Sequence, residues 1–176
     1  MKAVGFAVLL GVALLPGVVH ASSAENVRVE QAWLRILPGN LPAAGYAVLQ
    51  NTGDQPAALT GARSSLYANV MLHFSSVAGG TSRMHMAEAM PIPVHGSAQL
   101  APGGYHLMLS DPAHPMIPGD HVVLTLTFAD GSTLATTFIA RPANAVDAGP
   151  TSPLPPVPGA TAPLPPNTHG SAHKHP

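Results

Sequence analysis

Short apolar runs separated by turn residues fill the middle of this chain. Several runs are short and often β-branched, residues 27–34 alternate with a period of two, and no segment has sustained helical periodicity. The pattern predicts nine strands, at residues 27–34, 45–49, 57–62, 69–74, 81–86, 97–100, 105–109, 121–128 and 133–139. Asp130-Gly131, between the last two, is the strongest hairpin signal. We therefore expect an all-β domain, a Greek-key sandwich or barrel.

The first 21 residues have the pattern of a secretory signal peptide. Lys2 precedes an apolar run, and small residues follow it, so we expect cleavage after Ala21, with Ala24 as the alternative. An uncleaved membrane anchor is the competing interpretation, but the run is near the short end for spanning a bilayer and contains Pro16. We expect export to the periplasm and no transmembrane segment in the mature form.

Composition divides the rest into a folded domain at residues 25–141 and a tail at residues 142–176. The tail contains 10 of the 20 prolines and no aromatic residue, and its Pro-Leu-Pro-Pro segment at 153–156 recurs at 163–166. Such a segment cannot bury a core, so we expect a disordered C-terminal tail.

Charge argues against a nucleic-acid partner. Charged residues make up 9% of the chain, and loss of Lys2 with the leader leaves 6 basic against 8 acidic residues, a net charge of −2. No basic patch is visible, so we expect no nucleic acid to bind. The chain also has no cysteine, so its stability must come from the hydrophobic core, and a blue-copper centre, which needs a thiolate, is excluded.

Two histidines and two methionines form the candidate metal site: His73, Met84, His106 and Met108. Imidazole and thioether are soft, uncharged ligands that suit copper(I), whereas magnesium and calcium prefer oxygen. His106 and Met108 are two residues apart in a predicted strand and so share one face. Leu107 and Leu109 lie on the other face and point into the core.

The hairpin around Gly79-Gly80 would bring His73 close to the methionines of the following strand. A two-residue turn places His73 opposite Met86, whereas a four-residue loop places it opposite Met84. Met84 and Met86 share a face in either register, and His85 points the other way.

Other methionines and histidines have weaker claims as ligands. Met86 and Met71, which alternates with His73, are possible secondary metal contacts. The remainder are interpreted as core or surface residues: Met90, Met116, His95, His114 and His121.

These residues resemble the signature of the PCu(A)C family (DUF461-like) of periplasmic copper(I) chaperones. In that signature a His is followed after ten residues by a Met, and after a further twenty-one by His-x-Met, as in His73, Met84 and residues 106–108. The Pro-Gly-Gly-Tyr-His-Leu-Met-Leu segment at 102–109 and the Asn-Thr-Gly-Asp turn at 51–54 are also similar. Many relatives have an acidic residue and a Met directly after the first His, where this chain has Phe74-Ser75.

The resemblance implies a cupredoxin-like β fold that binds one copper(I) and is not an enzyme. It also implies delivery of copper to the copper-A centre in subunit II of cytochrome c oxidase, with a Sco-type thiol protein as a possible collaborator. A periplasmic copper-buffering or resistance protein would need the same site and is the alternative. A further alternative is a metal-free scaffold protein whose tail binds a partner protein.

The tail ends in His169, His173 and His175. Imidazole without thioether favours copper(II), so our hypothesis is that the tail captures copper(II) near the core site. The competing interpretation is a solvated, nonspecific tail.

Overall fold

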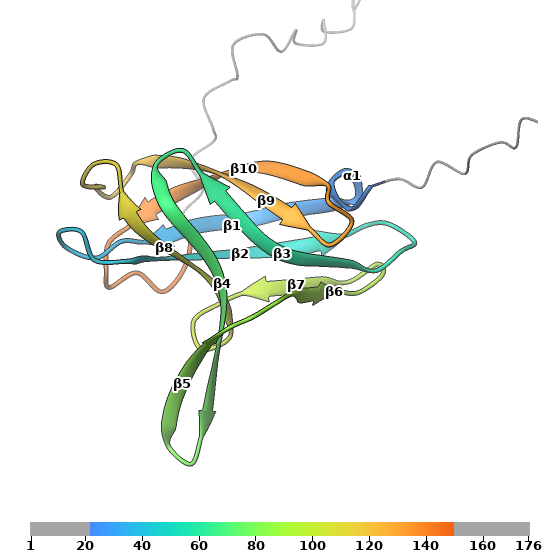
Figure 1. Ribbon diagram of the computed structural model, residues 1–176, viewed down its shortest axis with the longest axis horizontal. Coiled ribbons are helices and arrows are strands. Elements are labelled where there is room, and N and C mark those ends of the chain that lie inside the picture. The colour runs from blue at the N-terminus through green and yellow to red at the C-terminus, as the bar shows by residue number, and fades with distance from the viewer. Residues whose placement is uncertain (1–21, 150–176) are drawn as a thin grey trace, which may run out of the picture.

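The computed structural model describes residues 22–149, which form one short helix and ten strands (Figure 1). The predicted leader at 1–21 and the tail histidines lie outside the described residues. The elements are α1 (Ser23–Asn26), β1 (Val27–Arg35), β2 (Ala43–Asn51), β3 (Ala57–Ser64), β4 (Tyr67–Ala78), β5 (Thr81–Met86), β6 (Met90–Ile92), β7 (Ser97–Leu100), β8 (Tyr105–Pro112), β9 (His121–Phe128) and β10 (Thr133–Arg141).

All ten strands belong to one continuous open sheet in the order β5-β4-β8-β7-β2-β1-β10-β9-β3-β6. β8 also pairs directly with β2, and β3 and β4, consecutive in the chain, lie close together without pairing. The sheet thus folds over on itself around a single core. The prediction of an all-β fold is confirmed.

Alternation along the strands defines the inner face. In β9, Val122, Leu124, Leu126 and Phe128 are all fully or almost fully buried, and each contributes about 1.5–3 kcal/mol by leaving water. Where β2 crosses β8, Gly45 allows close packing, because a Cβ there would lie 3.2 Å from Leu107 Cβ. The sequence alternation therefore gave the core of these strands correctly.

The outer face of β1 and β2 is covered by the segment that follows β10. Trp33 and Tyr46 are 4% and 6% exposed but do not belong to the main core, and their rings pack with centroids 4.7 Å apart. Arg35 Nε donates a hydrogen bond to the carbonyl of Ala145 (3.2 Å), and Val146 lies beside the two rings. Residues 142–149 therefore run along the outer face of the sheet, held at Ala145, while most of their side chains stay exposed.

The β4–β5 hairpin projects from the body of the molecule as an arm (Figure 1). Gly79 and Gly80 have φ angles of 59° and 77°, and Ala78 pairs with Thr81. Two consecutive residues with positive φ in a two-residue loop are typical of a type I′ turn. Every residue of β5 is exposed, so the arm's outer half depends on the hairpin itself.

Three elements differ from the sequence prediction. β4 is longer than residues 69–74, because its outer half pairs with β5 beyond the core. β6 was missed, since it is three residues long and contains Pro91, which argues against a strand except at an edge, where β6 lies. The single turn of α1 is too short for helical periodicity to indicate. No helix within residues 22–149 is long and apolar enough to cross a membrane.

Candidate metal centre

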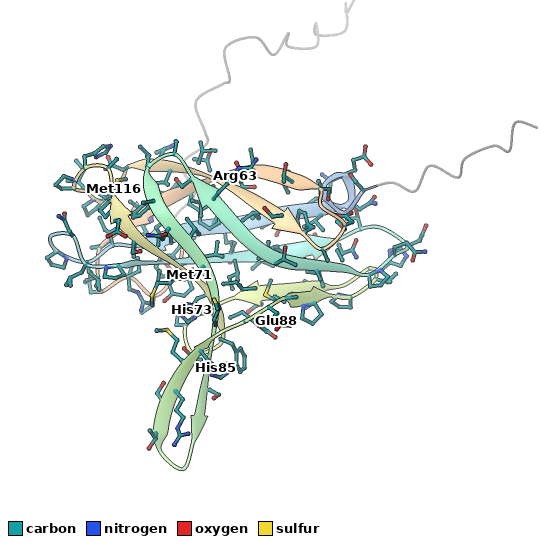
Figure 2. The ribbon with its side chains drawn as sticks, in the orientation of Figure 1. Arg63, Met71, His73, His85, Glu88 and Met116 are labelled. Carbon is teal, nitrogen blue, oxygen red and sulfur yellow. The ribbon has the colours of Figure 1, made fainter. Side chains whose placement is uncertain are left out.

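Strand register places both histidines of the candidate site on one outer face of the sheet. His73 on β4 lies directly opposite His106 on β8, and the next pair along the same ladder is Met71 opposite Met108. On its other side, His73 pairs with Met86 of β5. Directly opposed side chains point to the same face of a sheet. Figure 2 shows His73 and Met71 where the arm leaves the body.

The His106 ring is held in one orientation by the backbone. Its Nδ1 lies 3.0 Å from the carbonyl oxygen of Gly104, which also accepts a hydrogen bond from Ser75 N (3.1 Å). A carbonyl can only accept, so Nδ1 donates this hydrogen bond, which favours the tautomer whose Nε2 carries a lone pair. Nε2 lies 3.2 Å from Met84 Sδ. An imidazole nitrogen and a thioether sulfur, both potential metal ligands, are thus in contact.

His73 completes an imidazole pair. Its ring centroid is 5.8 Å from that of His106, with the rings nearly perpendicular at 80°. Its Nδ1 is buried and has no hydrogen-bond partner among the described residues. Burial lowers the pKa of His73, and the neighbouring His106 lowers it further. The ring therefore favours its neutral form, in which a nitrogen lone pair can bind a metal.

The structure separates the two arm methionines that the sequence left as alternatives. The two-residue turn is the one formed, so Met86 lies opposite His73 and Met84 opposite Ser75. Met84 nevertheless reaches His106, whereas Met86 is 71% exposed. Of the predicted quartet, contacts therefore join His73, His106 and Met84.

Met108 occupies the body side of the site. It lies between Met71 of β4 and Ala44 of β2 in the paired ladder. A cleft of about 330 Å³ opens beside Met108 and His106. Leu107 and Leu109 are fully buried, as the alternation of β8 predicted.

The remaining candidate residues lie elsewhere. His85 is on the opposite face of the arm, with its ring 5.7 Å from that of Phe74 (Figure 2). Met90 is a core residue, and His95 pairs with Asp54 at 2.9 Å. The other three also match the core or surface interpretation: Met116 is packed against the core, and His114 and His121 are exposed.

The donor set is soft. Within residues 22–149 no group of three or more His, Cys, Asp or Glu side chains is placed to hold a metal ion, so a site built from those ligands alone is absent there. Two neutral imidazoles with thioethers fit copper(I) better than zinc or calcium, because zinc more often recruits thiolate or carboxylate and calcium takes oxygen. The tail residues His169, His173 and His175 lie outside the described residues.

Comparison with solved structures defines the class of the fold. The copper-bound PCuAC domain from PmoF2 superposes with a TM-score of 0.56 at 24% identity, over 70% of this chain and 99% of that one. Copper(I)-bound DR1885 from Deinococcus radiodurans gives a TM-score of 0.55 at 30% identity, over 69% of this chain and 81% of that one. The protein thus has a PCuAC-type, cupredoxin-like β domain, and the resemblance seen in the sequence is confirmed.

Sequence comparison gives the family. The family model described as "Putative lipoprotein LpqE-like" matches residues 27–140, and the chain belongs to this family. A relative from Leifsonia xyli subsp. xyli (strain CTCB07), "Putative lipoprotein Lxx21020", is 35% identical over 111 residues. The match covers 62% of this chain and 66% of the relative, just under two thirds of its length.

Sequence reasoning missed two features of the site. Gly104 was noted only as part of the segment at 102–109, although its carbonyl accepts the hydrogen bond from His106 Nδ1. The Gly-Tyr-His spacing could have suggested this, because an Nδ1–H often bonds a backbone carbonyl. The cleft was also missed, because Leu37 and Pro42 reach it only through the pairing of β2 with β8.

Proposed function

We propose that this protein binds one copper(I) ion through His73, Met84, His106 and Met108, and acts as a carrier, not as an enzyme. The observation that carries the proposal is the contact of 3.2 Å between His106 Nε2 and Met84 Sδ. The copper-bound state of the two solved relatives supports it. Because copper(I) has one charge and the ligands have none, binding concentrates little charge in the protein.

The site has a gradient of exposure that suits transfer by ligand exchange. His106 is 6% exposed, whereas Met84 is 50% and Met86 71% exposed. An incoming ligand from another protein meets the thioethers of the arm first. The ion can then leave stepwise, with the buried imidazole as the last ligand released.

The proposed recipient is the copper-A centre in subunit II of cytochrome c oxidase, with a Sco-type protein as collaborator. The proposed compartment is the periplasm, reached through the leader at residues 1–21. The lipoprotein names of the family and the relative agree with export to the cell envelope. The 176 residues include no cysteine to carry an S-linked lipid, so the proposal concerns export and not lipid attachment.

Transfer to the recipient tests the proposed role. The mature chain loaded with copper(I) is mixed anaerobically with the metal-free copper-A domain, the two proteins are separated, and copper is measured in each. We expect copper to move to the recipient, and a strain that lacks the gene to lose oxidase activity in low copper. Retained copper with normal oxidase activity and increased copper sensitivity would instead support buffering and contradict delivery.

A further inference from the structure

An apolar cleft beside the metal centre has no role in the proposed function. It measures about 330 Å³ and is called here the Tyr46 cleft. Its lining includes Leu37, Pro42, Ala44, Tyr46, Pro102 and Met108. Arg35 also lines it, with its guanidinium 5.2 Å from the Tyr46 ring centroid. The cleft is therefore an apolar, aromatic-lined surface that ends at a candidate ligand.

The described end of the chain leads to this cleft. Residues 146–148 lie beside Trp33, Tyr46 and Pro102, and the last two also line the Tyr46 cleft. A Cβ on Gly149 would lie 2.9 Å from the Arg141 guanidinium carbon, and Arg141 pairs with Arg35 across the sheet. The chain thus runs along the same outer face with most of its side chains exposed, and its described part ends beside Arg141, the strand partner of the cleft residue Arg35.

The sequence that follows matches the surface. Residues 153–156 read Pro-Leu-Pro-Pro, and 163–166 repeat this. Proline-rich segments bind aromatic-lined grooves as preformed polyproline II helices, which lose little entropy on docking. Pro153 is four residues beyond Gly149, a span of about 12 Å in that conformation, roughly the width of two to three strands.

We propose that residues 153–156 dock in the Tyr46 cleft as an intramolecular strap. The strap lies against the Tyr46 ring and the apolar side chains that line the cleft. The docking rests on the cleft and the course of the chain, and it does not depend on copper binding.

Because the 176 residues include no cysteine, any disulfide within or between chains must join introduced cysteines. Ala44→Cys is combined with Leu154→Cys in the full mature chain, without metal, in a thiol–disulfide buffer. The control combines Leu154→Cys with His121→Cys. His121 is exposed and pairs with Ile139, close to where the chain leaves the sheet. We expect an intramolecular disulfide to form about tenfold or more faster in the Ala44 pair, because docking raises the effective concentration.

Tail variants identify the docked segment. In the Ala44 pair, Pro155→Ser with Pro156→Ser should lower the rate of disulfide formation to that of the control pair. Pro165→Ser with Pro166→Ser should leave that rate unchanged. Thermal melting of the single Ala44→Cys variant checks the fold. Equal rates in both pairs would overturn the proposal and leave the cleft to another protein. Disulfide-linked dimers would overturn it in favour of a second copy, and none of these outcomes bears on copper binding.

Discussion

His106 and Met84 meet across two strands that do not pair with each other, with Nε2 3.2 Å from Sδ. The hydrogen bond from Nδ1 to the Gly104 carbonyl favours the tautomer in which Nε2 carries a lone pair, so the contact brings together two potential metal ligands. The hairpin supplies the sulfur and the body supplies the nitrogen. Metal affinity should therefore depend on both donors and on the geometry of the arm.

Replacing Met84 by leucine should weaken copper(I) binding by on the order of 100-fold or more, since loss even of groups that only orient ligands costs about 10–100-fold. The matched control is Met90→Leu, which removes a thioether that is buried in the core and not among the candidate ligands. This change should alter affinity less than about threefold and stability by less than about 1.5 kcal/mol. Competition with a chromophoric chelator measures the copper(I) affinity of both variants. Equal affinities of Met84→Leu and Met90→Leu would exclude Met84 as a ligand.

Met86→Leu should have a smaller effect on affinity than Met84→Leu, about threefold or less, because this side chain is 71% exposed. Its effect should appear in the rate at which a chelator removes copper, because an exposed thioether can assist exchange. Stopped-flow measurement of that rate separates the two variants. A loss of affinity as large as that of Met84→Leu would instead make Met86 the ligand opposite His73.

Protonation of His73 should weaken copper(I) binding only below the ordinary histidine range. Burial and His106 hold the pKa of His73 below its usual 6.5, so the ring stays neutral and binding-competent until the pH is lower than that value. A lowered pKa in the folded state also means that protons favour the unfolded state. Stability of the metal-free protein should therefore decrease as the pH falls below about 6.5.

Chelator titrations and thermal melts between pH 8 and pH 5 test this dependence, with His73→Gln as the control. The variant should lose the part of the stability change that comes from His73 while keeping that of other groups. An unaltered pH profile of stability in the variant would contradict the assignment to His73.

The sequence predicted what depends on local alternation. Residues 121–128 of β9 and the sharing of one face by His106 and Met108 follow from the period of two. The register of the arm stayed open, because an exposed strand has no buried face to select it. The parallel pairing of β1 with β10 joins residues far apart in sequence, and so does the antiparallel pairing of β8 with both β4 and β2. No local pattern specifies these pairings.

The turn at the end of the arm should control affinity from a distance. Gly79 has a φ of 59°, which a β-branched residue adopts only with strain of about 1–3 kcal/mol, so Gly79→Val should loosen the arm and weaken copper(I) binding. Gly79→Asn creates the Asn-Gly sequence that type I′ turns favour, so this variant should bind copper(I) normally. Amide hydrogen exchange in β5 checks the loosening, and equal affinity in both variants would show that the arm need not be ordered.

The central claim is tested most directly by an anaerobic copper(I) competition titration of the mature chain, residues 22–176, against a chromophoric chelator. His106→Ala and Met108→Ala are titrated alongside, with their melting temperatures measured to establish folding. The account predicts one tight equivalent for the unmodified protein and on the order of 100-fold or more weaker binding for each variant. Failure of the unmodified protein to compete with the chelator, or unchanged affinity in both variants, would contradict it.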